Sequence, residues 1–172
     1  MTTIGGLKPF ALLGGYNAAE LWPAVNLILP TWLLLAFAPR WKHTPLLTLL
    51  GPIFFATMYT LCSISLMFLG DDSTSNEIDM SSLEGVVQLF SDPSGVFVGW
   101  VHFLVYDALV ARWIVMDSVE RAGDTKGMVF HLCVIFPILL VSLMLGPMGW
   151  LSYLAIVRPF LLPIGGSKTK SS

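Results

Sequence analysis

Long apolar runs alternate with short polar interruptions along this chain, and the pattern predicts membrane-spanning helices. A helix needs about 20 apolar residues to cross hydrocarbon, where it closes its own backbone hydrogen bonds. Four runs fit this requirement, near residues 21–38, 46–69, 96–119 and 128–158. We therefore predict an all-α, polytopic membrane protein, a bundle of about four transmembrane helices. A single transmembrane domain is predicted over residues 1–164, with a polar C-terminal tail over 165–172.

Prolines predict where these helices bend. Pro23 suits the first turn of a helix, where its missing N–H costs nothing, whereas Pro30 is predicted to kink the first span. The fourth run continues to Leu162 and is too long for one upright span. Gly146-Pro147 interrupts it, so we predict a helix kinked at this dipeptide, with an extension rather than a fifth full span.

The segment 71–94 is polar and acidic and contains neither lysine nor arginine. Within it, Ser82–Phe90 has apolar residues at spacings of three and four, which is typical of a short amphipathic helix. These residues are Leu83, Val86, Val87 and Phe90. We expect this helix to lie on the membrane surface.

Composition agrees with a lipid environment. The chain is 55% hydrophobic and 12% charged, whereas a soluble domain carries roughly a quarter charged residues. The net charge of −2 provides no basic surface for nucleic acid, so membrane lipid is the expected partner. Cys62 and Cys133 each stand alone in an apolar run and are predicted to be small buried hydrophobic residues, without metal-type spacing.

Targeting and orientation signals are weak. The N-terminus has neither a cleavable secretory signal nor the Ser- and Arg-rich pattern of a plastid presequence, so we expect an internal helix to direct insertion unless a presequence is absent from this chain. Lysines and arginines divide four against four between the two predicted sides. The positive-inside rule therefore favours only slightly a cytoplasmic or stromal position for the two short basic connections.

The third span carries ionisable groups through its middle, namely His102, Asp107, Arg112 and Asp117. Each costs about 2.5–3.5 kcal/mol at a helix centre and normally faces the interior of a bundle. At 100° per residue, His102 and Asp117 lie within about 60° of each other, whereas Asp107 and Arg112 point about 140° and 280° away from His102. No lipid-facing stripe avoids all four, so this helix is predicted to have neighbours on more than one side.

Partners for these charges are expected from other helices. Asp107 and Arg112 are five residues apart, which is poor spacing for an ion pair within a helix. We predict that Arg112 pairs with a carboxylate, either Glu20 of the first span or Asp107 after local unwinding. Two interpretations stay open: polar groups that fix packing by hydrogen bonds, and a polar site within the membrane that performs chemistry or holds a ligand.

Pigment binding is a further possibility for the histidines. Neutral imidazole commonly ligates metals, so His102 and His131 are candidate axial ligands of a chlorophyll magnesium, and Glu20 is a third candidate pigment contact. Tryptophans near predicted helix ends are typical of an aromatic belt at the membrane interface, with stacking on a polyene as the alternative. They are Trp22, Trp41, Trp100 and Trp150.

Several of these residues form a spaced pattern. A Leu89-Phe-Ser lead-in is followed by Trp100-Val-His102, then Asp107, Arg112 and Asp117 at intervals of five. This pattern resembles the abscisic-acid-deficient-4-type membrane proteins of plants, algae and bacteria. The segment from Leu145 to Tyr153 is similar to that family's Gly-Pro-x-Gly segment. The earlier Leu29-Pro30-Thr31-Trp32 and the basic turn that follows it match the family more loosely.

The resemblance covers most of residues 21–158, with departures. Tyr106 and Ala108 stand where aromatic and bulkier residues are commoner in the family, and the acidic loop is longer. In plants the family is implicated in forming neoxanthin from violaxanthin. The resemblance therefore implies a xanthophyll-related protein of the plastid thylakoid or envelope membrane, with a carotenoid as substrate or ligand and no redox cofactor.

If the protein is an enzyme, the resemblance implies opening of a xanthophyll 5,6-epoxide to an allenic alcohol. This isomerisation needs an acid that protonates the epoxide oxygen and a base that removes a C–H proton. Asp107 and His102 are our candidates for these roles, with Arg112 tuning the local field and Asp117 as a further catalytic candidate.

The competing hypothesis is not catalytic. A small apolar bundle of this kind also suits a pigment-binding or assembly subunit of a photosynthetic complex, with photosystem or antenna subunits as partners and with chlorophyll as a possible ligand. A transporter is the third class, and it predicts broken helices in matching repeats. The breaks at Pro30 and Pro147 lie in unlike contexts, so we rank this class last.

Overall fold

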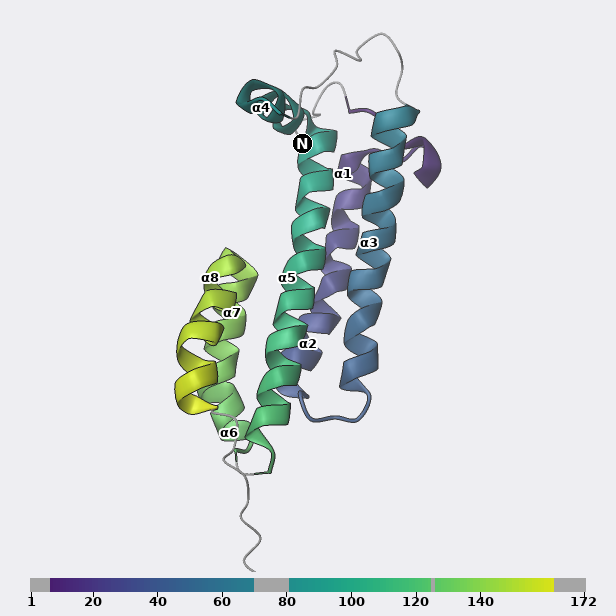
Figure 1. The fold of residues 1–172 in the computed structure, drawn as a ribbon. Coiled ribbons are helices and arrows are strands. Elements are labelled where there is room, and N and C mark those ends of the chain that lie inside the picture. The colour runs from purple at the N-terminus through teal and green to yellow at the C-terminus, as the bar shows by residue number, and fades with distance from the viewer. Residues whose placement is uncertain (1–6, 70–80, 125, 163–172) are drawn as a thin grey trace, which may run out of the picture. The chain divides into compact units, whose positions relative to one another are not determined.

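The computed structural model describes residues 7–69, 81–124 and 126–162, and the regular elements in these ranges are helices (Figure 1). Four described segments are long and apolar enough to cross a membrane: Ala18–Phe37, Thr44–Phe68, Pro93–Ala122 and Met128–Leu145. The prediction of an all-α, polytopic membrane protein is therefore confirmed. The predicted tail over 165–172 lies outside the described residues.

The chain divides into two compact units. Unit 1 comprises Met1–Ile28 and Pro52–Val105, and unit 2 comprises Leu29–Gly51 and Tyr106–Ser172. Helices α3 (Thr44–Phe68) and α5 (Pro93–Ala122) contribute residues to both units. Each unit is described below by itself.

The first span is built from three helical pieces. Helix α1 (Ala18–Leu21) begins at a capping box, continues as the 3₁₀ helix η2 (Trp22–Ile28) and then becomes α2 (Leu29–Phe37). Pro30 occupies the first turn of α2, where a proline is tolerated because its N–H has no helical partner there. The first span therefore changes from a 3₁₀ helix to an α-helix just before Pro30.

Aromatic packing organises unit 1. A short 3₁₀ turn, η1 (Ala11–Leu13), follows Phe10, whose fully buried ring lies 5.9 Å from the ring of Phe97 on α5. The backbone N–H of Leu12 donates to Ser65 Oγ of α3 at 3.1 Å. The segment before the first span is thereby fixed against two long helices of its unit.

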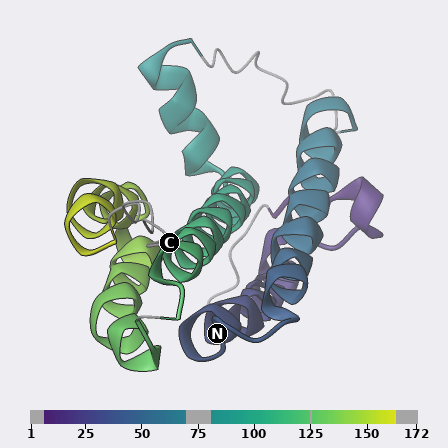
Figure 2. The same cartoon turned by 60° about the horizontal axis from the view of Figure 1, so that its bottom comes forward.

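The predicted amphipathic helix is present as α4 (Leu83–Ser91), which matches the predicted Ser82–Phe90 to within a residue. Its N-terminus is capped by Ser82, whose hydroxyl accepts from the N–H of Gly85. Asp92 joins α4 to α5 and caps the N–H of Ser94 at 2.8 Å. The two helices meet at a steep angle in both ribbon views (Figures 1 and 2).

The fourth span of the chain, which lies in unit 2, contains a wide helical turn. Helix α6 (Met128–Phe130) passes into the π-helix η4 (His131–Ile135) and then α7 (Phe136–Leu145). The N–H of Phe136 bonds the carbonyl of His131, five residues back. Pro137 follows directly, and a proline ring clashes with the carbonyl four residues back, so the wider turn accommodates it.

The interruption at Gly146-Pro147 falls where predicted, but it is a reversal and not a kink. Helix α8 (Pro147–Ser152) and the π-helix η5 (Tyr153–Leu161) run back beside α7 (Figures 1 and 2). The two arms pack closely because Gly149 has no side chain. A β-carbon there would overlap Ser142 Oγ and lie 2.6 Å from the backbone nitrogen of Ser142.

Both ends of this hairpin lie at one end of unit 2. The Lys126 ammonium donates to the carbonyl of Leu161, and Arg121 Nη1 donates to that of Leu162 at 3.5 Å. Arg40, from the turn after α2, donates to the carbonyls of Gly123 and Lys126 at 2.8 and 2.6 Å. The extension predicted to lead away from the fourth span therefore returns to where that span began.

The two cysteines differ in burial. Cys62 of α3 is fully buried, as predicted, whereas Cys133 of η4 is exposed. The prediction of a buried Cys133 is wrong, because an apolar run that faces lipid has the same sequence signature as one that faces protein.

Candidate functional site

The four ionisable residues that the sequence places on the third span all lie on α5 but not in one unit. His102 belongs to unit 1, whereas Asp107, Arg112 and Asp117 belong to unit 2. Their surroundings differ sharply.

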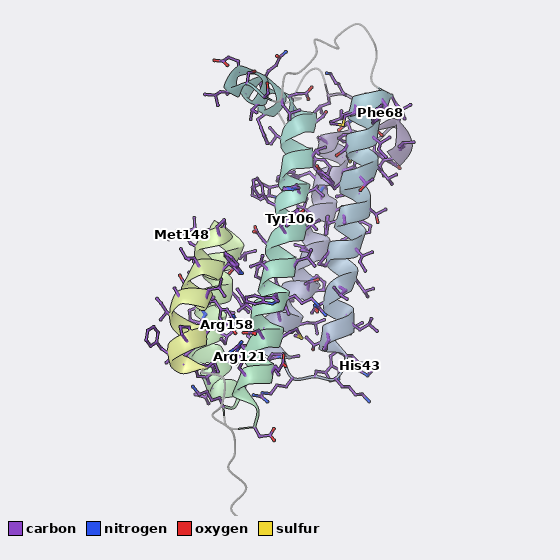
Figure 3. The ribbon with its side chains drawn as sticks, viewed as in Figure 1. His43, Phe68, Tyr106, Arg121, Met148 and Arg158 are labelled. Atoms are coloured by element: carbon purple, nitrogen blue, oxygen red, sulfur yellow. The ribbon has the colours of Figure 1, made fainter. Side chains whose placement is uncertain are left out.

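Asp117 is the centre of a dense polar cluster in unit 2. Its Oδ2 accepts from Arg121 Nε at 2.8 Å, from the Tyr153 hydroxyl at 2.6 Å and from Arg158 Nε at 3.2 Å. Its Oδ1 accepts from Arg158 Nη2 at 3.3 Å. Figure 3 shows Arg121 and Arg158 close together between α5 and η5. We call these residues, with Asp117, the Asp117 cluster.

An aromatic ring completes the Asp117 cluster. Trp113, one turn before Asp117, meets the Tyr153 ring edge-on at 5.7 Å, and the Arg158 guanidinium lies 5.6 Å from its centroid. The Asp117 side chain is only 14% exposed, and charged donors occupy both of its oxygens. The cluster thus ties the returning arm of the hairpin to α5 through charge-assisted hydrogen bonds.

Asp107 occupies a different position, at the midpoint of α5 and beside the tip of the hairpin. A β-carbon at Gly146 would lie 2.5 Å from Asp107 Oδ1, so only glycine allows the carboxyl group to approach the turn this closely. No described residue of unit 2 donates a hydrogen bond to Asp107 or forms an ion pair with it. Its oxygens are therefore not engaged within its unit.

Arg112 does not pair with Asp107. Its Nε and Nη2 both donate to the carbonyl of Pro45 in the first turn of α3, at 3.3 and 2.8 Å. Helix α5 is continuous through these positions, and a separation of five residues turns the two side chains about 140° apart. The predicted pairing with Asp107 is wrong. Glu20 lies in the other unit, so that part of the prediction stays open.

Glu20 has a local structural role. Its Oε2 accepts from the N–H of Asn17 at 2.9 Å, and Asn17 Oδ1 in turn accepts from the N–H groups of Ala19 and Glu20. This reciprocal capping box starts α1. A pigment contact by Glu20 stays a prediction.

The candidate histidines lie in different environments. The His102 ring, in unit 1, lies 5.5 Å from that of Tyr59 on α3 and 5.9 Å from that of Phe103. His131 is buried in unit 2, and its Nε2 is 3.0 Å from the carbonyl of Leu35 on α2. Since a carbonyl accepts only, this nitrogen carries the proton and is not available to a metal. Pigment ligation by either ring stays a prediction.

Sequence reasoning missed three members of the Asp117 cluster. Arg121 follows Asp117 by four residues, the spacing of a good ion pair within a helix, and could have been found from this signal. Tyr153 and Arg158 could not, because they reach α5 only when the chain reverses at Gly146.

Comparison with known proteins identifies the family of this chain. The chain matches the family described as ABA DEFICIENT 4-like over residues 21–153. The match contains all of α5 and extends through the hairpin tip to Tyr153. No curated protein and no solved structure matches the chain. Since the matched range covers most of the sequence, the chain belongs to the ABA DEFICIENT 4-like family.

Proposed function

We propose that this protein isomerises violaxanthin to neoxanthin in a plastid thylakoid or envelope membrane. Membership of the family supports the choice of a xanthophyll substrate. The observation that carries the chemistry is the position of Asp107, whose carboxyl group lies at the midpoint of α5 against the hairpin tip, where none of the described residues of its unit donates a hydrogen bond to it. A carboxyl group within a membrane is costly and marks a functional site.

The reaction needs proton transfers only. Protonated Asp107 gives its proton to the epoxide oxygen, and the C–O bond breaks to leave a hydroxyl group. A base removes a proton from a neighbouring carbon, and the electron pair of that C–H bond forms the new double bond of the allene. The base then returns a proton to Asp107. The candidates that the sequence offers for this base are His102 and a second carboxylate. No electrons leave the substrate, so the step needs no oxidant or reductant.

The hydrogen-bond partners of Asp117 and Asp107 distinguish a structural carboxylate from a candidate catalytic acid. Asp117 accepts hydrogen bonds on both oxygens from two arginines and a tyrosine, which suits a structural carboxylate. In the described part of unit 2, no arginine or tyrosine donates to Asp107 in this way. Beside it on α5, Tyr106 (labelled in Figure 3) is 57% exposed and offers an aromatic surface to a substrate that arrives from the lipid.

An Asp107→Asn variant tests the proposal. The wild-type protein and the variant are expressed in a host that accumulates violaxanthin, and the neoxanthin-to-violaxanthin ratio is measured by chromatography. We expect the variant to lose conversion by about 100-fold or more, as for loss of a general acid. The control is Asp124→Asn, an exposed carboxylate on the turn after α5, which should convert normally.

Two results would contradict the enzyme assignment. Normal conversion by Asp107→Asn at equal protein level would remove Asp107 from the mechanism. A wild-type protein that converts nothing, but co-purifies with carotenoid or chlorophyll and with photosystem or antenna subunits at fixed stoichiometry, would establish the pigment-binding alternative instead.

A further inference from the structure

We infer that α4 is an interfacial helix that inserts one defined face into the boundary between lipid headgroups and acyl chains. Its nine residues divide into three sectors at 100° per residue. The least exposed sector comprises Gly85, which is buried, and Val86 and Leu89, which are half-buried. The exposed apolar sector follows: Leu83, Val87 and Phe90, with exposed fractions of 73%, 58% and 46%. The exposed polar sector completes the circle: Glu84, Gln88 and Ser91.

Separate apolar and polar exposed sectors are what an interfacial helix needs. A helix in water would expose mainly polar residues, and a helix packed wholly in protein would bury its apolar stripe. Here the apolar stripe is exposed, whereas the neighbouring sector of Gly85, Val86 and Leu89 is buried or half-buried. One exposed sector can therefore face acyl chains while the other faces water and headgroups.

A tight corner prevents α4 from rotating to hide its apolar stripe. A β-carbon at Gly95 would overlap the carbonyl oxygen of Leu89, and one at Gly99 would lie 2.5 Å from the Phe90 ring. The two glycines thus let the last turn of α4 sit directly on the first turns of α5. The direction in which Leu83 and Val87 point is fixed by this contact.

The occupant of the stripe is lipid, because the stripe continues a surface that already faces lipid. On the neighbouring part of α5, Val96, Trp100 and Phe103 are 43%, 48% and 57% exposed. The Trp100 ring lies 5.9 Å from that of Trp22, an aromatic pair of the kind found at membrane interfaces. At the corner itself, Lys8 forms an ion pair with Asp92 at 3.2 Å, which suits the polar headgroup level.

Charge identifies the class of lipid surface. The segment 71–94 contains no lysine or arginine, and α4 itself contributes Glu84. Attraction to anionic headgroups therefore does not bind α4 to the bilayer. The burial of apolar area binds it instead. The insertion should be the same in zwitterionic and anionic bilayers, unlike that of a basic amphipathic helix.

Nitroxide scanning of the full-length protein tests this inference, independently of the catalytic proposal. Cys62 and Cys133 are replaced by alanine, and single labels are placed at positions 83, 87, 84 and 88 in reconstituted zwitterionic vesicles. At 83 and 87 we expect accessibility to oxygen several-fold above accessibility to a water-soluble nickel chelate. At 84 and 88, the matched controls on the polar sector, we expect the reverse.

The alternatives give different results. Chelate access at 83 and 87 equal to that at 84 and 88 would place α4 in water. Low access to both reagents at 83 and 87 would mean that a second copy or another protein covers the stripe. Insertion that requires anionic lipid would overturn the role assigned to apolar burial. Each of these outcomes rejects the inference.

Discussion

At the scale of single residues, two carboxylates on one helix have opposite characters. Asp117 is held by Arg121, Arg158 and Tyr153, whereas Asp107 lies against the backbone of Gly146. Both are aspartates in an apolar span, and spacing within α5 distinguishes them only through Arg121, which follows Asp117 by four residues. The rest of the difference comes from the reversal of the chain at Gly146, which brings Tyr153 and Arg158 to Asp117 and a glycine to Asp107.

Removal of the Tyr153 hydroxyl tests the structural role of the Asp117 cluster. Tyr153 is fully buried and donates to an ionised group, so Tyr153→Phe should lower the free energy of unfolding by about 1.5–3 kcal/mol. The measurement is an unfolding titration in mixed micelles. Tyr16→Phe, at a site 56% exposed, should change it little. Equal effects of the two variants would show that the hydrogen bond to Asp117 contributes nothing.

At the scale of elements, the sequence predicted what apolar periodicity controls. The first three long segments and α4 are present close to their predicted ranges, whereas the fourth span, predicted over 128–158, ends at Leu145. The reversal was not predicted, since Gly-Pro marks a kink and a tight turn equally well. The tight turn forms because Gly149 fits against Ser142 and Gly146 fits against Asp107. These are tertiary contacts, and the local sequence pattern around Gly146 does not reveal them.

A methyl group at Gly149 tests this explanation of the hairpin. In Gly149→Ala the new β-carbon would lie 2.6 and 2.7 Å from the backbone nitrogen and Cα of Ser142, which cannot move aside as a flexible side chain does. We expect destabilisation of about 1–3 kcal/mol and a lower thermal midpoint in detergent. Gly127→Ala is the control, because no atom lies within 4 Å of its β-carbon position. Similar midpoints for both variants would reject tight packing of the two arms.

At the scale of the whole molecule, the hairpin changes the charge balance between the two sides. The sequence predicted four lysines and arginines on each side of the membrane, with Arg158 and Arg121 on opposite sides. In the structure, both bind Asp117 in unit 2, and Lys126 and Arg40 lie at the same end through contacts with Leu161 and Gly123. The positive-inside rule then favours this end on the cytoplasmic or stromal side more strongly than the sequence pattern did.

Cysteine labelling tests this arrangement. In a chain without Cys62 and Cys133, single cysteines at Asp124 and Phe160 should react with a membrane-impermeant maleimide from the same side of sealed vesicles. Both positions are exposed, Phe160 by 77%, and both lie at the base of the hairpin. Labelling from opposite sides would show that the returning arm continues across the membrane.

The closed base of the hairpin also bears on how the chain is inserted during synthesis. An arm that starts at Lys126 and returns to Leu161 enters the bilayer as a loop, so neither Lys126 nor Arg158 has to be translocated. Passage of one such cation through the hydrocarbon would cost about 2.5–3.5 kcal/mol on insertion scales. The hairpin can therefore pack against the preceding helices after they have been inserted. Asp117 on α5 then accepts hydrogen bonds from Tyr153 and Arg158 of the returning arm.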